Sequence, residues 1–123
     1  MTDLPIRPVL PAIADALARN RPVVLRAPPG AGKTTAVPPA LLPAPWRGDG
    51  TILMLEPRRI AARAAAGRMA RLRGEEAGGT IGYRVRLDAR VGPATRIEVV
   101  TEGIYLRRIQ GDPALDGVAA VLF

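Results

Sequence analysis

A glycine-rich turn between an apolar run and a helical segment constrains the fold of this chain more than any other sequence feature. Residues 23–27 (VVLRA) form a β-branched run bounded by prolines, which is typical of a buried strand. The turn GAGKT follows at residues 30–34, and residues 34–42 favour a helix that Pro38 and Pro39 should distort or end early. A strand, a glycine turn and a helix in this order predict a loop that binds phosphate.

The residue types of this turn fit a nucleoside triphosphate. Gly30 and Gly32 allow backbone N–H groups to approach phosphate oxygens closely, and the helix that follows directs its positive end at the same anion. Lys33, the only lysine of the chain, supplies charge between the β- and γ-phosphates, and the Thr34 hydroxyl is the expected Mg²⁺ ligand. The expected cofactors are ATP and Mg²⁺. Ala27 stands where the strict pattern has glycine.

Charge and composition narrow the class of protein. The 123 residues carry a net charge of +7 and 48% hydrophobic residues, as expected for a globular chain with affinity for polyanions such as RNA or DNA. Almost all basic residues are arginine, so a general coding bias, or a view of only part of a larger protein, explains the charge equally well. The absence of cysteine and histidine excludes disulfides and Cys/His metal sites.

Targeting signals are not visible in the sequence. The N-terminal MTDLPIRP has an acid and prolines where a signal peptide has a basic start and an apolar run. The apolar stretches are all shorter than the ~18 residues of a membrane span. We expect a cytoplasmic protein without a membrane partner, in an oligomeric state that the sequence leaves open.

Strands and helices alternate along the predicted chain. This order, with several strands apolar on both faces, predicts an α/β fold with a mostly parallel sheet. The last strand ends abruptly, so we expect the N-terminal part of a longer protein. The expected helices are 8–20, 34–42, 58–73 and 102–110; the expected strands are 23–27, 51–56, 81–87, 96–100 and a buried 118–123; the expected loops and turns are 44–50, 74–79, 89–94 and 111–117.

The predicted phosphate loop is only half of a catalytic site. Hydrolysis also needs an acid that holds Mg²⁺ and a carboxylate that positions water. The Mg²⁺ acid is expected at the end of a later buried strand, here 118–123, whereas Asp112 and Asp116 precede that strand. We therefore expect these 123 residues alone to bind nucleotide weakly and not to hydrolyse it.

Five segments in order resemble the DEAH-box superfamily 2 helicases: APPGAGKTT, LEPRRIAAR, IGYRVR, VVTEGIYLRRI and DPALDGVAAVLF. The resemblance covers essentially the whole chain. It implies a three-layer RecA-like P-loop NTPase domain, of which residues 1–123 are the N-terminal part and whose C-terminal part is missing. In the family the last strand leads into an Asp-Glu-x-His box, which would begin just after Phe123. Alanine at the position of Ala27 is common among such helicases. The implied activity of the full-length protein is ATP-dependent helicase action on RNA or DNA.

The resemblance also assigns residues to the nucleotide site. Lys33 and Thr34 take the catalytic positions, and Thr34 is the implied metal ligand. Thr35 matches a second hydroxyl residue of the motif, and Arg68 lies where an arginine can stack on adenine, although an exposed helix face explains Arg68 as well. The cofactor-binding residues are Pro29, Gly30, Ala31, Gly32, Lys33, Thr34, Thr35 and Arg68.

Two further segments resemble nucleic-acid contacts of the family. Arg58 and Arg59 match a motif that meets the nucleic-acid backbone, and arginines at a strand-to-helix junction suit phosphate oxygens. A solvated helix start is the alternative. The nucleic-acid residues that the resemblance implies are Arg58, Arg59, Thr101, Glu102 and Gly103.

Other roles remain open for several of these side chains. Thr101 can also serve as the N-cap of the following helix. Tyr105 stands where the family more often has an aliphatic residue, and a role in packing alone is the alternative. Arg84 and Arg86 share one side of a strand, as a nucleic-acid track or as solvent-facing residues.

Two other function classes are compatible with a phosphate loop. One is a phosphotransferase or NTPase of another P-loop class, such as a small-molecule kinase, but the sequence shows neither a lid nor an acceptor-binding region. The other is a non-catalytic nucleic-acid-binding module that retains the loop. The order of the PRR and TEG segments after the loop favours the helicase.

Overall fold

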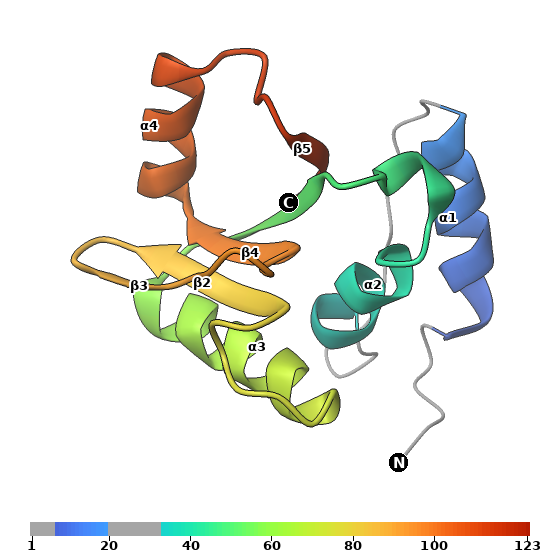
Figure 1. The fold of residues 1–123 in the computed structure, drawn as a ribbon, viewed down its shortest axis with the longest axis horizontal. Helices are drawn as coiled ribbons and strands as arrows, with labels where there is room; N and C mark the ends of the chain where they lie inside the picture. The colour runs from blue at the N-terminus through green and yellow to red at the C-terminus, as the bar shows by residue number, and fades with distance from the viewer. Residues whose placement is uncertain (1–6, 20–32) are drawn as a thin grey trace.

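The computed structural model describes residues 7–19 and 33–123 (Figure 1). The expected strand 23–27 and most of the phosphate loop lie outside the described residues. None of the helices in the described ranges is long and apolar enough to cross a membrane. In chain order the elements are η1 Arg7–Val9, α1 Leu10–Ala18, α2 Lys33–Leu41, η2 Pro45–Arg47, β1 Thr51–Glu56, α3 Arg59–Leu72, β2 Ile81–Val85, β3 Asp88–Arg90, β4 Ile97–Thr101, α4 Glu102–Gly111 and β5 Val118–Leu122.

The described strands form one mixed sheet in the order β3-β2-β4-β1-β5. β1 runs parallel to β4 and β5, β4 runs parallel to β2, and the short β3 is antiparallel to β2. Parallel strands need crossover connections: α3 connects β1 to β2 and α4 connects β4 to β5, and in each case one other strand of the sheet lies between the two strands that the helix joins. The prediction of a mostly parallel α/β sheet is confirmed.

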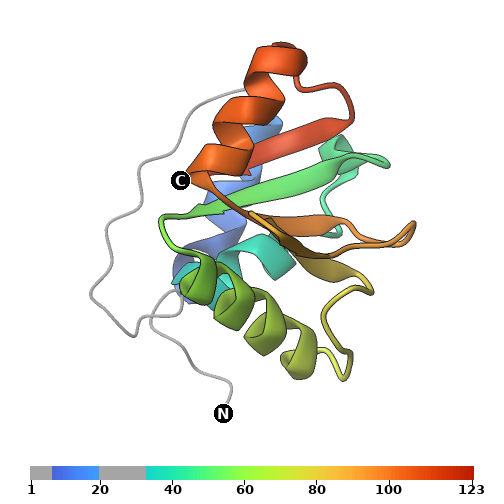
Figure 2. The same ribbon diagram turned by 90° about the vertical axis from the view of Figure 1, so that its left-hand side faces the viewer.

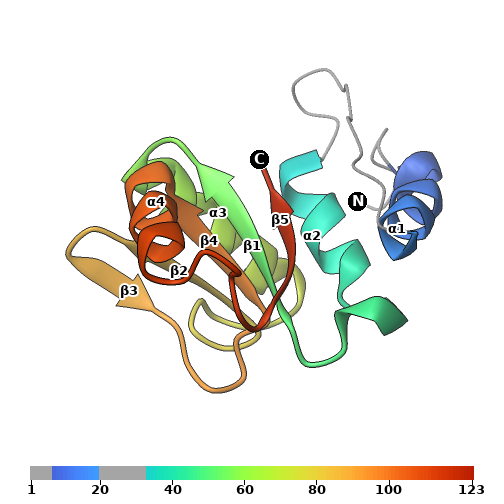
Figure 3. The same cartoon turned by 90° about the horizontal axis from the view of Figure 1, so that it is seen from above.

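Helices cover both faces of the sheet. α3 packs on β1, β2 and β4 from one side, and α1 and α2 continue this layer. α4 contacts β4 and β1 from the other side (Figure 2). Viewed from above, α4 is seen nearly end-on over the sheet and β5 runs alongside β1 (Figure 3). The chain therefore has the three layers expected of a RecA-like domain.

The main core lies between α3 and the sheet. α3 buries one face through residues at the i, i+3, i+4, i+7 spacing of an amphipathic helix. These residues are Ala62, Ala65, Ala66, Met69 and Ala70. Because alanine is small, the helix backbone lies close to the sheet, and the arginines of the helix are left on its outer side. The expected helix 58–73 is confirmed to within one residue at each end.

The segment after β2 differs from the expectation. Residues 89–94 were predicted to be a turn, and residues 93–94 do form one, but a further turn lies at Arg86 and Leu87, inside the expected strand 81–87, and Asp88–Arg90 forms β3. Leu87 has a φ of 67°, the left-handed conformation that glycine or asparagine usually adopts. The sequence carries neither residue here, so it gives no signal for this hairpin.

The prolines of α2 do not end the helix early. α2 continues through Pro38 and Pro39 to Leu41. Each proline lacks the N–H that would bond to the carbonyl four residues earlier. Pro38 and Leu41 are almost fully buried in the core, and this packing stabilises the helix where its internal hydrogen bonds cannot.

The last strand is less buried than predicted. β5 was expected to be apolar and buried on both faces, but all five of its residues are only half-buried. Within the described residues β5 pairs only with β1, which leaves its other edge without a described neighbour. The strand itself is at the predicted position.

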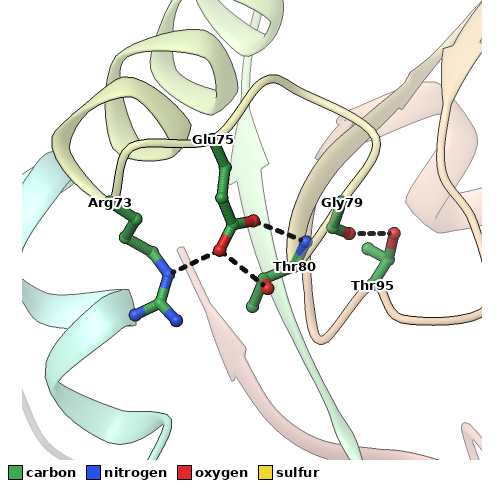
Figure 4. A network of polar contacts seen from close by, with 5 residues as sticks. All are labelled: Arg73, Glu75, Gly79, Thr80 and Thr95. Atoms are coloured by element: carbon green, nitrogen blue, oxygen red, sulfur yellow. Dashed lines mark hydrogen bonds and ion pairs between the residues drawn. The ribbon is translucent and has the colours of Figure 1, made fainter.

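A carboxylate organises the turn between α3 and β2, at the predicted breaker 74–79 (Figure 4). Glu75 accepts a 3.0 Å hydrogen bond from the Thr80 backbone N–H and a 3.1 Å bond from the Thr80 hydroxyl, and Arg73 Nε lies 3.5 Å away. These contacts, the backbone N–H above all, lower the pKa of Glu75. Thr95 closes the far side of the turn by donating a 2.7 Å hydrogen bond to the Gly79 carbonyl.

Candidate nucleotide and nucleic-acid site

The structure describes the helix that follows the phosphate loop. α2 begins at Lys33, as the motif requires, and Thr35 is half-buried in its first turn. Pro29, Gly30, Ala31 and Gly32 lie outside the described residues. The nucleotide-binding and metal-binding roles of residues 29–35 remain predictions.

The two predicted nucleic-acid segments meet at one edge of the sheet. β1 ends at Glu56 and β4 ends at Thr101, and the parallel register pairs these two residues directly. Pro57-Arg58-Arg59 follows β1, and Glu102-Gly103 follows β4. Segments that are more than 40 residues apart in the sequence are thus neighbours at the carboxyl ends of adjacent strands, where open α/β sheets bind their ligands.

Arg58 and Arg59 are both exposed at the start of α3. Arg58 is the N-cap residue, with an extended backbone (φ −133°, ψ 147°), and its carbonyl accepts the first helical hydrogen bond from Ala62 at 2.9 Å. Two guanidinium groups therefore stand at the positive end of a helix. This combination suits a phosphate group, since the backbone N–H groups of the first turn point the same way.

In the segment 101–103, the hydroxyl of Thr101 differs from the capping role that the sequence suggests. Thr101 occupies the N-cap position of α4, but its hydroxyl makes no capping hydrogen bond with any described residue. Its side chain is buried instead, whereas Glu102 and Gly103 are exposed. A Cβ on Gly103 would meet nothing within 4 Å among the described atoms, so a ligand backbone can approach this helix end closely.

Arg68 lies on the exposed side of α3. It is in the third turn of the helix and is not brought together with Arg58 or Arg59 by the fold. The contact of Arg68 with adenine stays a prediction.

A buried carboxylate beside the second segment was not singled out in the sequence. Glu98 of β4 is only 8% exposed, and its Oε2 atom lies 3.2 Å from Arg84 Nε and 3.6 Å from Arg108 Nη1. Arg84 is exposed, as the solvent-facing alternative expected, and it also pairs with this carboxylate, while its role in a nucleic-acid track stays a prediction. The sequence signal that could have identified Glu98 is a single charged residue inside the apolar run IEVV. Its arginine partners could not be identified in the same way, because they depend on the register of the strands.

The described residues hold no cluster of three or more carboxylates that could bind a metal ion. Thr34 thus stays the one predicted Mg²⁺ ligand of the chain. By residue type, a hydroxyl, an ammonium and glycine amides are the donors that a magnesium-bound triphosphate needs, and their assignment to Thr34, Lys33, Gly30 and Gly32 stays a prediction.

No protein-family model matches the chain. Its sheet and helix layers are those of the RecA-like α/β domain of DEAH/RHA helicases, and the resemblance seen in the motifs is confirmed. One relative of the chain is HrpB. Over 122 residues the chain is 51% identical to the ATP-dependent RNA helicase HrpB of Escherichia coli (strain K12), covering 99% of this chain and 15% of that protein.

Solved structures and more distant relatives agree with this result. The crystal structure of the Escherichia coli DEAH/RHA helicase HrpB superposes with a TM-score of 0.89 at 52% identity, over 97% of this chain and 15% of the other. The DExH-box ATP-dependent RNA helicase DExH3 of Arabidopsis thaliana is 38% identical over 115 residues, which are 90% of this chain and 10% of that protein. The chain thus spans a small part of the length of these relatives.

Proposed function

We propose that the protein carrying this chain is an ATP-dependent RNA helicase, and that residues 1–123 are the N-terminal part of its first RecA-like domain. In this proposal residues 29–35 bind ATP and Mg²⁺, and the segments 57–59 and 101–103 hold the backbone of RNA. The names of the relatives support the activity and the choice of RNA over DNA.

The observation that carries the proposal is the pairing of Glu56 with Thr101 in the sheet register. It sets the exposed Arg58 and Arg59 beside the exposed Gly103, with two helix N-termini at the same edge. A run of nucleic-acid phosphates needs repeated contacts along a line, which two adjacent segments provide and one segment does not.

Each residue of the nucleotide site has a separate role in the proposal. Gly30 and Gly32 admit the phosphates to backbone N–H groups, Lys33 neutralises charge between the β- and γ-phosphates, and Thr34 ligates Mg²⁺. Arg68 stacks on the adenine ring. Bound Mg²⁺ supplies charge neutralisation at the γ-phosphate when it is present.

The experiment measures RNA binding as a function of salt concentration, using the gene product that carries this chain. Replacing Arg58 with alanine removes one phosphate contact, so we expect about fivefold weaker binding and a log–log salt slope smaller by about one. The matched control is Arg71→Ala, which removes an exposed arginine from the last turn of the same helix. Equal losses in both variants would show that only net charge matters. Single-stranded DNA of the same sequence tests the preference for RNA.

A further inference from the structure

Helix α4 carries the second RNA segment at its N-terminus, yet it is weakly attached to the sheet. Measured against the described part of the chain, none of its ten residues is buried, and Leu106 is exposed. α3, on the opposite face, buries five residues. Apolar packing therefore positions α3 firmly and α4 poorly, and the position of α4 depends on other contacts.

An open hollow of about 790 Å³ lies beside α4 and separates it from the β2–β3 hairpin. Its lining residues come from both elements and from β4 between them: Arg84, Val85, Leu87, Asp88, Ala89, Glu98, Ile104, Arg107 and Arg108. Side chains of the hairpin and of the helix do not fill the space between them, so the hairpin does not hold the helix by close packing.

Glu98 connects the two sides of this hollow. It is the one charged residue of β4, and its side chain is 10% exposed. One oxygen, Oε2, contacts Arg84 of β2 at 3.2 Å and Arg108 of α4 at 3.6 Å. A carboxylate at this depth needs positive partners, and removing one partner is costly because it leaves the charge less well compensated.

From this arrangement we infer that Glu98 is a positioning residue for RNA binding, which acts by holding Arg108 in the last turn of α4 and thereby the orientation of the helix whose first turn belongs to the RNA segment. Glu98 itself does not touch RNA. The inference rests on the proposed function, because it assigns Thr101, Glu102 and Gly103 to the RNA interface. Arg84 compensates the carboxylate from the sheet, and Arg108 transmits its position to the helix.

The direction in which Glu98→Gln changes RNA affinity distinguishes this positioning role from a purely electrostatic effect of the charge. Glu98→Gln removes a negative charge near a polyanion site, which by itself strengthens RNA binding or leaves it unchanged. If Glu98 positions α4, the same substitution weakens binding, by about five- to tenfold for a coupling of ordinary size. Unchanged or tighter binding by Glu98→Gln overturns the inference.

Two arginine variants provide a matched pair. Arg84→Met and Arg108→Met each remove one positive charge from the same carboxylate oxygen, but only Arg108 belongs to α4. We expect weaker RNA binding for Arg108→Met and nearly wild-type binding for Arg84→Met. The double variant Glu98→Gln/Arg108→Met should bind no more weakly than either of its single variants. Equal losses for the two arginine variants overturn the inference, since net charge alone would then account for them. Additive losses in the double variant overturn it as well, since Arg108 would then act on RNA independently of Glu98.

Amide hydrogen exchange without RNA tests the structural half of the inference separately. In the gene product that carries this chain, Glu98→Gln should speed exchange of the α4 amides and leave those of α3 unchanged. Unchanged α4 exchange overturns the inference. If the wild-type protein binds no RNA, the proposed function fails and the assignment to RNA binding fails with it, while the exchange data still report whether Glu98 holds the helix. If Glu98→Gln does not fold, Arg108→Met carries the same test from a half-buried helix position.

Discussion

Tyr83 and Asp88 close the β2–β3 hairpin through their side chains. The phenol hydroxyl donates a 2.8 Å hydrogen bond to Asp88 Oδ2, and Arg63 Nε of α3 lies 3.6 Å from the same oxygen. Tyr83 is buried in the main core, so the hydrogen bond links the core to the hairpin and to the helix beneath it. It holds together a turn that contains a left-handed leucine.

Removing this hydroxyl should destabilise the fold measurably. For Tyr83→Phe we expect the free energy of unfolding to fall by about 2 kcal/mol, the ordinary net contribution of one hydrogen bond to a charged group. Chemical denaturation measures the change. The control is Tyr105→Phe, which keeps the edge-on ring contact of Tyr105 with Phe123 and should leave stability unchanged. Equal effects of the two substitutions contradict the role given to the hydrogen bond.

The turn at Glu75 predicts a pH dependence of stability. The pKa of Glu75 in the folded protein lies below its ordinary value of 4.5, chiefly because the Thr80 N–H bonds to the ionised carboxylate. The ionised form thus stabilises the fold at pH values above 4.5, and this contribution is lost as pH falls through the lowered pKa.

Urea denaturation of Glu75→Gln at several pH values measures the effect. The variant should be less stable than wild type near neutral pH, and the difference should shrink as pH falls below 4.5. Thr80→Val removes the hydroxyl but keeps the backbone donor, so its loss should be smaller and should follow the same pH trend. A stability difference that is constant down to acidic pH would argue against the ion pair and hydrogen bonds described for Glu75.

Gly82 tolerates no side chain. A Cβ at this position would overlap the carbonyl oxygen of Arg90 and would lie 3.1 Å from a Val91 methyl carbon. Because the obstacle is backbone, relief requires the strand to shift, and we expect Gly82→Ala to cost about 3 kcal/mol or to prevent folding. Gly111→Ala, where a Cβ would have open space among the described atoms, is the control and should be close to neutral. Thermal melting that shows no difference between the two variants would contradict this geometry.

Elements that depend on local interactions could be predicted from the sequence, whereas those that depend on contacts between distant residues could not. The strand 51–56 and the helix over α3 were predicted well, because burial of one face leaves a local period that one segment displays on its own. The hairpin was missed because Leu87 adopts a conformation for which the sequence gives no cue. The early helix end expected at Pro38 and Pro39 was wrong, because packing of α2 in the core outweighs the low helix propensity of proline.

In the candidate site, too, local motifs identify residues but do not show which of them lie close together. Arg58 and Thr101 could be chosen from their motifs, but their proximity depends on the register of β1 with β4, which no local pattern reports. Glu98 was missed for the same reason, since both of its arginine partners lie on other elements. The phosphate loop was the strongest prediction from the sequence, and residues 29–32 are outside the part of the chain that the structure describes.

ATP hydrolysis with and without single-stranded RNA, measured on the gene product that carries this chain, tests the central claim most directly. We predict that RNA raises the rate, that Lys33→Ala abolishes both nucleotide binding and hydrolysis while the protein stays folded, and that Arg58→Ala reduces the stimulation by RNA but not the rate without it. A Lys33→Ala variant that binds ATP as well as wild type does, or a hydrolysis rate that does not respond to RNA, would contradict the account.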